Sequence, residues 1–181
     1  MHLKKTAIAI LFTVSTGLSA GAGATENTTI SLGFVNSHAK LKIDNLSRSD
    51  NLHGLNLKYR YEFNDRFGVV TSVLRSKVIY NIKNQGQKTG SADATYYSLT
   101  SGPSYRLNQY VSTYALAGIG HARFNGNIDP FHKTFTHNAF TAGTGFQFNI
   151  TQNVSLDTHY EYAQFKNLKM NTFTAGVGYR F

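Results

Sequence analysis

The sequence predicts an all-β fold: an eight-stranded, antiparallel, up-and-down transmembrane β-barrel. Three observations lead to this fold class. Apolar and polar residues alternate with a period of two over most of the chain, whereas helical periodicity is nearly absent. Short and long connections between the alternating segments follow one another in turn. The amino terminus resembles a secretory signal, which indicates that the chain leaves the cytoplasm.

Residues 1–24 have the pattern of a signal peptide that is removed on export. Two lysines near the amino terminus precede a short apolar stretch over residues 7–14, and small residues then lead to the motif Ala22-Gly23-Ala24. The apolar stretch is too short to anchor the chain across a bilayer. We expect the mature chain to comprise residues 25–181, with cleavage after Ala22 as the alternative.

Alternation marks eight segments of the mature chain. In the second segment, one side is apolar and aromatic and the other is charged or polar: Leu55, Leu57, Tyr59 and Tyr61 against Asn56, Lys58, Arg60 and Glu62. Two segments are weaker, because 67–78 has apolar residues on both sides and 112–124 has small residues on both. The phase of 112–124 is therefore left open. The segments are centred on 28–39, 55–62, 67–78, 97–107, 112–124, 140–148, 154–162 and 173–181.

The connections differ in length according to the end of the barrel on which they lie. Tight turns rich in Asn and Asp are predicted at 64–66, 108–109 and 149–153. Together with export, alternating long and short connections indicate the bacterial outer membrane. A closed sheet is required there, because every backbone N–H and C=O must be paired in hydrocarbon. The four long or protruding extracellular loops are expected at about 40–53, 79–95, 125–137 and 166–169.

The charged side of the strands is predicted to point into the barrel. A soluble barrel with the same number of strands would place apolar residues inside. Turning Lys58 or Arg60 toward lipid would cost about 2–4 kcal/mol each near the bilayer midplane. An eight-stranded interior only has room for its own side chains, so we interpret the inward charges as a packed polar network. An ion pathway is the alternative. The network comprises Lys58, Arg60, Glu62, Arg106, Asp157, Glu161 and Arg180.

Charge is distributed unevenly along the mature chain. The formal net charge is +9, and removal of Lys4 and Lys5 with the signal lowers it to +7. All of this surplus falls in the regions of the long connections, with eleven basic against four acidic residues. A basic chain can bind nucleic acid, but export and the absence of a nucleic-acid-binding motif argue against that partner.

The basic residues of the outer end are the candidate binding residues. We expect them to bind host polyanions or surface proteins, and the alternative is that they contact only the phosphates of the surrounding lipopolysaccharide. Arg75 and Lys77 occupy positions where aromatic residues are expected, which indicates that this strand rises into the phosphate layer. The candidates are Arg75, Lys77, Lys83 and Lys88 in and beside the second long connection, followed by Lys166 and Lys169 in the fourth.

Enzyme chemistry is not expected. The chain has no Cys, which removes disulfides and thiolate chemistry. His121, His159 and Asp157 are the residues that could support catalysis near the outer rim. However, His159 lies between Asp157 and Glu161 on the inward side, where it can join the polar network. No metal-binding H-x-x-x-H spacing occurs, and no cofactor is predicted.

Four strand motifs, in order, resemble the OmpX/Ail/PagC/Lom family of small outer-membrane barrels. The motifs are Gly54-Leu55-Asn56-Leu57-Lys58-Tyr59-Arg60-Tyr61-Glu62, Ser101-Gly102-Pro103-Ser104-Tyr105-Arg106-Leu107-Asn108, Gly143-Thr144-Gly145-Phe146-Gln147-Phe148-Asn149 and Ala175-Gly176-Val177-Gly178-Tyr179-Arg180-Phe181. The resemblance covers about residues 28–181. It implies an eight-stranded barrel with protruding strand ends, and a surface role in adhesion, invasion or complement resistance. The implied partners are lipopolysaccharide and host cell-surface, matrix or complement-regulating molecules.

The carboxyl end of the sequence carries a second resemblance. Tyr179 and the terminal Phe181, with apolar residues at alternate positions, resemble the signal that the outer-membrane assembly machinery reads. Closure of an aromatic girdle is a compatible structural role for the same residues.

Overall fold

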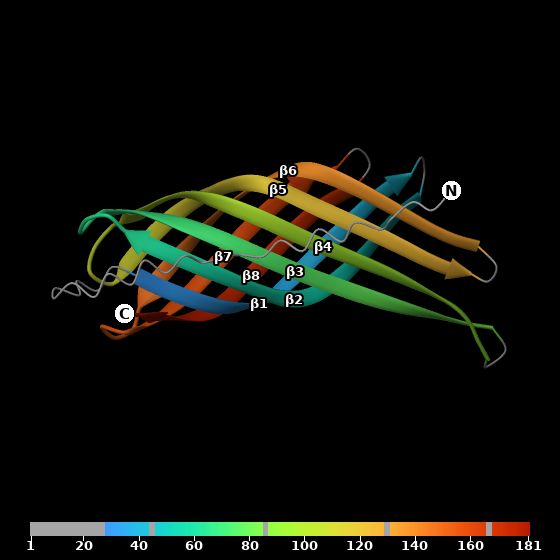
Figure 1. The fold of residues 1–181 in the computed structure, drawn as a ribbon, viewed down its shortest axis with the longest axis horizontal. Coiled ribbons are helices and arrows are strands. Elements are labelled where there is room, and N and C mark those ends of the chain that lie inside the picture. The colour runs from blue at the N-terminus through green and yellow to red at the C-terminus, as the bar shows by residue number, and fades with distance from the viewer. Residues whose placement is uncertain (1–27, 44–45, 85–86, 129–130, 166–167) are drawn as a thin grey trace, which may run out of the picture.

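The computed structural model describes residues 28–43, 46–84, 87–128, 131–165 and 168–181 (Figure 1). The expected signal peptide lies outside the described residues. No helix in the described part of the chain is long and apolar enough to cross a membrane. The strands are β1 (Thr28–Ile43), β2 (Leu46–Glu62), β3 (Phe67–Asn84), β4 (Gln87–Arg106), β5 (Val111–Ile128), β6 (Phe131–Asn149), β7 (Val154–Gln164) and β8 (Leu168–Arg180).

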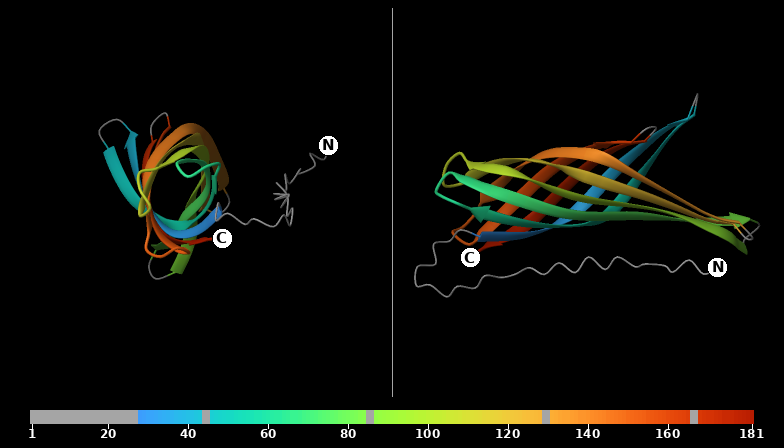
Figure 2. Two further views of the ribbon diagram at one scale, coloured as in Figure 1. Left: turned by 90° about the vertical axis from the view of Figure 1, so that its left-hand side faces the viewer. Right: turned by 45° about the horizontal axis from the view of Figure 1, so that its top comes forward.

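The eight strands form one closed antiparallel sheet. Each strand pairs with its neighbours in sequence, and β1 closes the barrel against β8 with Ile30 opposite Tyr179. The view along the barrel in Figure 2 shows the ring of strands. The predicted fold class and strand number are confirmed. Since no strand in the membrane part has an unpaired edge, the backbone is satisfied without water.

The tight turns lie at the end of the barrel where β8 ends (Figure 1). Asn64 Oδ1 accepts hydrogen bonds from the backbone N–H groups of Arg66 and Phe67, at 3.0 and 2.8 Å. Asn108 makes the equivalent bonds one hairpin later, to the N–H groups of Tyr110 and Val111. Asn side chains thus close these turns locally, as the sequence predicted.

The regions expected to be long connections are mostly strand. The β3–β4 ladder continues to Asn84 opposite Gln87, and the β5–β6 ladder continues to Ile128 opposite Phe131. These hairpins project well beyond the barrel wall in Figures 1 and 2. Alternation of apolar and polar residues could not reveal these strand ends, because a ribbon that lies in water is polar on both faces.

Four strands remain paired above the membrane part of the barrel. The β2–β3 ladder begins only at His53 opposite Lys77, whereas the β4–β5 ladder reaches Gly90 opposite Ile128. As a result, β3, β4, β5 and β6 leave the barrel as one sheet. This sheet places side chains from β3, β4 and β5 beside one another at the outer end.

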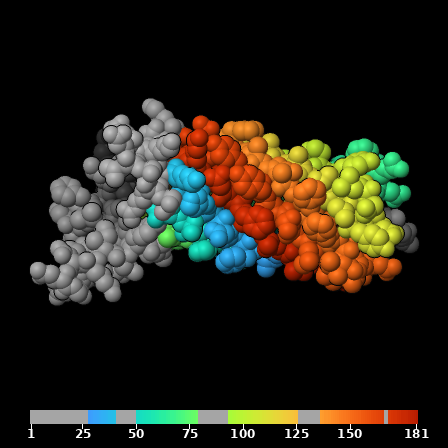
Figure 3. Space-filling view, turned by 180° about the vertical axis from the view of Figure 1, so that it is seen from behind, coloured from blue at the N-terminus to red at the C-terminus, as the bar shows by residue number. Residues whose placement is uncertain are grey.

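The outer wall is apolar and the inner wall is polar over the membrane part. Leu32, Phe34, Leu57 and Phe173 are among the large apolar side chains that are exposed on the outside. Figure 3 shows the close-packed outer surface over β6, β7 and β8. β5, whose phase the sequence left open, turns Tyr114 inward. Inside-out patterning therefore holds around the barrel.

The orientation of the strands leads to a prediction about insertion. Leu57→Arg, in the middle of the lipid-facing side of β2, is expected to lower the free energy of unfolding by about 2–4 kcal/mol. Urea unfolding in phospholipid vesicles measures this loss. The control is Asn51→Arg on the same strand, at an exposed position above the membrane part. An equal loss for both variants would contradict the assigned orientation.

Candidate functional site

The innermost layer of the lumen is built around one carboxylate. Glu62 accepts hydrogen bonds from Arg180 Nη2 at 3.1 Å and from Arg106 Nη2, and it forms an ion pair with Arg60, whose Nη2 lies 2.7 Å from Glu62 Oε1. These groups come from β2, β4 and β8, which all reach the inner end of the barrel here. Arg60 Nη1 also donates to Gln147 Oε1 at 3.3 Å. Four of the predicted network residues are therefore in direct contact.

The middle layer contains a buried ion pair. Lys58 Nζ contacts Asp157 Oδ1 and also donates to Tyr114 Oη at 2.8 Å. Tyr114 Oη in turn donates to Asp157 Oδ2 at 2.9 Å, so each of the three side chains contacts the other two. Tyr114 was not among the predicted network residues, because 112–124 has small residues on both sides and its inward face could not be assigned from the sequence.

Glu161 occupies a separate layer, closer to the outer end. Its Oε1 accepts a hydrogen bond from Tyr96 Oη at 2.9 Å. Tyr96 precedes the outward-facing Tyr97, so the alternation of this strand already places Tyr96 inside. The seven residues of the predicted network thus separate into an arginine layer, a Lys58–Asp157 pair and a Glu161–Tyr96 pair.

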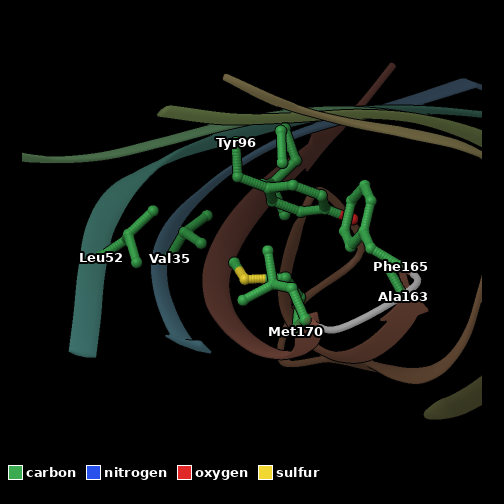
Figure 4. Close-up of a cluster of buried hydrophobic side chains, with 9 residues drawn as sticks. Val35, Leu52, Tyr96, Ala163, Phe165 and Met170 are labelled. Carbon is green, nitrogen blue, oxygen red and sulfur yellow. The ribbon is translucent and has the colours of Figure 1, made fainter. Parts of the chain in front are cut away.

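Above these polar layers, apolar side chains that were not predicted pack in the lumen beside the hydrogen-bonded side chains of Ser37, Ser76 and Thr172. Leu74 is 0% exposed, and the other members of its cluster lie on or next to β1, β2, β4, β5, β7 and β8 (Figure 4). Leu74 is two positions after the inward-facing Ser72, so the alternation of the strand could have placed Leu74 inside. We define the outer apolar layer as Val35, Leu52, Leu74, Phe165 and Met170.

The two histidines that were considered for catalysis lie on opposite sides of the barrel wall. His159 is buried in the lumen with its ring 5.9 Å from that of Tyr114, and neither ring nitrogen has a hydrogen-bond partner among the described residues. His121 faces outward and contacts Asn138 Oδ1 through Nδ1 at 2.6 Å. Within the described ranges, no group of three or more His, Cys, Asp or Glu side chains is arranged to hold a metal ion.

Basic, aromatic and amide side chains form one row across the outside of β3, β4, β5 and β6, near the outer end of the β2–β3 ladder. Arg75, Tyr97, His121 and Asn138 are successive partners on β3, β4, β5 and β6. The Arg75 guanidinium carbon lies 5.6 Å from the centre of the Tyr97 ring, within the range of a cation–π contact. The Tyr97 and His121 rings are 6.5 Å apart. The row therefore holds Arg75 against an aromatic face.

A second row continues the basic surface further outward. Lys77 Nζ lies 3.9 Å from Asp93 Oδ2, and Asn125 Nδ2 donates to the same oxygen at 3.1 Å. Arg123 Nε donates to Asn125 Oδ1 at 3.2 Å. The Lys77 side chain is 41% exposed, so its ion pair with Asp93 is weak and leaves the ammonium accessible. We define the outer basic surface as Arg75, Lys77, His121 and Arg123.

The position of the outer basic surface along the barrel follows from strand length. Phe67 packs on Tyr105 at the inner end of the barrel. The stretch of β3 from Phe67 to Arg75 is nine residues long. A tilted strand crosses the hydrocarbon core in about 9–11 residues. Arg75 therefore lies where the wall leaves the hydrocarbon.

Among the other predicted binding residues, Lys169 is the one whose side chain the structure describes. Lys83 and Lys88 are opposite one another in the β3–β4 ladder, and their side chains lie outside the described ones. Lys169 is on β8 opposite Lys40 of β1, separated from β3 by β1 and β2. Lys166 lies outside the described residues. Tyr179 and Phe181 are exposed on the wall with their rings 4.9 Å apart.

Comparisons with known proteins agree with this architecture. The model of the outer membrane protein beta-barrel domain matches residues 8–181. The chain is 35% identical to the attachment invasion locus protein of Yersinia enterocolitica over 158 residues, which are 87% of this chain and 88% of that protein. It is 33% identical to outer membrane protein X of Escherichia coli K12 over 182 residues, which are 99% and 100% of the two chains.

Solved structures include a close neighbour. The crystal structure of Ail, the attachment invasion locus protein of Yersinia pestis, in complex with the heparin analogue sucrose octasulfate matches with a TM-score of 0.79. The identity is 34%, and the match covers 87% of this chain and 100% of that one. The four strand motifs, the closed barrel and these relatives agree: the chain belongs to the outer-membrane β-barrel family of Ail and OmpX and resides in the bacterial outer membrane.

Proposed function

We propose that this protein is a surface adhesin whose outer basic surface binds sulphated or phosphorylated polyanions on a host cell or its matrix. The observation behind this proposal is the grouping of Arg75, Lys77 and Arg123 on one exposed face, where Asp93 is the one carboxylate that contacts them among the described side chains. Polyanions are attracted by such a surface at long range and then held by charge-assisted hydrogen bonds.

The relatives support a polyanion as the ligand class. The Yersinia pestis protein was crystallised with a heparin analogue, and two relatives are named for attachment and invasion. In this chain, Tyr97 supports the Arg75 guanidinium from one side and leaves its edge available to an anion. We infer a binding role without an enzymatic one, since Asp157 is occupied by Lys58 and Tyr114.

Heparin binding tests the proposal. The triple variant Arg75→Gln/Lys77→Gln/Arg123→Gln is expected to bind immobilised heparin at least about tenfold more weakly, because one charge-assisted hydrogen bond contributes about 1.5–3 kcal/mol. Binding of the unchanged protein is expected to fall as salt rises, through screening. The measurement is surface plasmon resonance with the protein in phospholipid nanodiscs.

A matched variant separates a local surface from net charge. Lys40→Gln/Arg66→Gln/Lys169→Gln removes the same three charges at exposed positions away from the outer basic surface. It is expected to retain most of the heparin affinity. If both triple variants lose affinity equally, only the overall charge matters, and the outer basic surface is not the binding site.

Lipopolysaccharide is the second candidate ligand, favoured by the height of Arg75 on the wall. A guanidinium that leaves the hydrocarbon at this level lies at the depth of lipid phosphates. Repeating the heparin measurement in membranes that contain lipopolysaccharide distinguishes the two functions. If lipopolysaccharide leaves the heparin affinity unchanged, the adhesin function is supported. If it abolishes heparin binding, the basic residues bind the lipid phosphates instead.

Complement resistance is a finer role that needs its own assay. A non-pathogenic strain that expresses the protein is compared in human serum with one that expresses the Arg75→Gln/Lys77→Gln/Arg123→Gln variant. Survival that depends on these residues supports defence against complement through the same surface. Survival equal to that of the empty strain argues against it.

A further inference from the structure

Among the described residues, the inner end of the lumen contains more positive than negative charge. β2, β4 and β8 end at Glu62, Arg106 and Arg180, so these side chains share the last layer before the periplasm. Three guanidinium groups contact the single Glu62 carboxylate there. The neighbouring carboxylate, Asp157, is already paired with Lys58. Arg60 and Arg106 alone already place two positive charges beside the one negative charge of Glu62.

This surplus lies in a poorly solvated place. The Arg60 and Glu62 side chains are 3% and 7% exposed, whereas those of Arg106 and Arg180 are 18% and 16% exposed. Buried charge without a counter-charge is costly, and hydrogen bonds to water satisfy donors without neutralising them. Arg106 and Arg180 are therefore the cations of this layer that are most accessible from outside the barrel.

Hydrogen-bond donors without partners surround the same layer. Arg60 Nε, Arg106 Nε, Ser104 Oγ and Ser112 Oγ are buried and have no hydrogen-bond partner among the described residues. Ser112 is the ladder partner of Arg106 on one side and of Gln147 on the other. The set combines hydroxyls and guanidinium groups, which is the donor chemistry that oxyanions require.

We propose that Arg60, Arg106 and Arg180 form a periplasm-facing site for a small inorganic oxyanion of the phosphate or sulfate class. The planar guanidinium fork matches two oxygens of a tetrahedral anion. The anion takes hydrogen bonds from Arg106 and Arg180 at the mouth and shares the positive layer with Glu62. Since it binds the folded barrel, it stabilises the closed arrangement of β2, β4 and β8 by mass action.

Arginine side-chain NMR tests this site directly. The protein in phospholipid nanodiscs, with ¹⁵N-labelled arginine, is titrated with inorganic phosphate while ionic strength is held constant with gluconate. The Nε–Hε resonances of Arg60 and Arg106 are expected to shift along a saturating curve, while that of the turn residue Arg66 stays in place. Shifts that grow linearly, or that are the same for gluconate alone, overturn the proposal.

Two variants change the affinity in opposite directions. Arg106→Gln is expected to weaken phosphate binding at least about tenfold, as the loss of one charge-assisted hydrogen bond predicts. Glu62→Gln removes the competing carboxylate, so it is expected to bind phosphate more tightly. Its thermal unfolding midpoint should rise with phosphate more than that of the unchanged protein.

The Glu62→Gln variant distinguishes an anion site from a structural ion-pair cluster. A purely structural cluster loses stability in this variant and regains none of it with phosphate beyond the gluconate control. Arg66→Gln is the matched control for charge at the same end of the barrel. If chloride replaces phosphate with equal affinity, the site is a general halide site and the assignment to an oxyanion is wrong.

Discussion

Asp157→Ala is expected to lower the free energy of unfolding by about 3–5 kcal/mol, because it leaves Lys58 as an uncompensated buried cation. Asp157 accepts hydrogen bonds from both Lys58 and Tyr114 in the middle of the lumen. Its removal also deprives the buried Tyr114 hydroxyl of its carboxylate acceptor and leaves it the Thr158 carbonyl oxygen at 3.3 Å. Urea unfolding in phospholipid vesicles, followed by tyrosine fluorescence and by mobility of the unheated protein in gels, measures the loss.

A double variant shows whether charge is the cause. Lys58→Met/Asp157→Leu replaces the pair by apolar side chains of similar length and is expected to recover most of the stability that Asp157→Ala loses. The control Asp65→Ala removes a carboxylate from an exposed turn and is expected to change stability by less than about 0.5 kcal/mol. An Asp157→Ala variant as stable as the control would mean that the ion pair contributes nothing.

The second large effect concerns passage of ions through the lumen. The unchanged protein is expected to show no conductance above that of a protein-free planar bilayer, because the outer apolar layer excludes water. Leu74→Ser/Met170→Ser places hydroxyls at two buried positions of this layer, at 0% and 2% exposure. The double variant is expected to raise the conductance at least about tenfold through hydration of the constriction.

Neighbouring positions provide the control for conductance. Val73→Ser/Phe173→Ser makes the same kind of change on β3 and β8 at side chains that face lipid. This variant is expected to remain non-conducting when it inserts. If the unchanged protein already conducts ions, the outer apolar layer is not a barrier. That result would support the alternative that the lumen is an ion pathway.

The membrane part of the fold could be predicted because its signal is local. Tyr59 and Lys58 differ by one position, and the cost of placing a charge in lipid decides which of them faces outward. Leu57 outside and Arg60 inside repeat that decision along the same strand. Asn64 and Asn108 identify their turns in the same way, through bonds to residues two and three positions further on.

The protruding strand ends could not be predicted in this way. From Ile79 to Thr95 the sequence shows no sustained period-two alternation of apolar and polar residues, although the β3–β4 ladder continues through this region to Asn84 opposite Gln87. Arg75 and Lys77 were recognised as unusual for a lipid-facing strand. Their neighbours Tyr97, His121 and Arg123 come from strands more than twenty residues further along the chain, and only strand register brings them together.

By itself, the sequence determined which face of most strands meets lipid, how many strands close the barrel and which end carries the excess of basic residues; the phase of β5 stayed open. Those properties depend on alternation and turn chemistry within a few residues, where hydration and hydrocarbon act on each segment separately. Only the tertiary structure decided that Glu62 gathers three arginines, that Tyr114 joins Lys58 to Asp157, and that Leu74 meets Met170 in an apolar layer. Such contacts cross the barrel, so they follow from the stagger and tilt of all eight strands together.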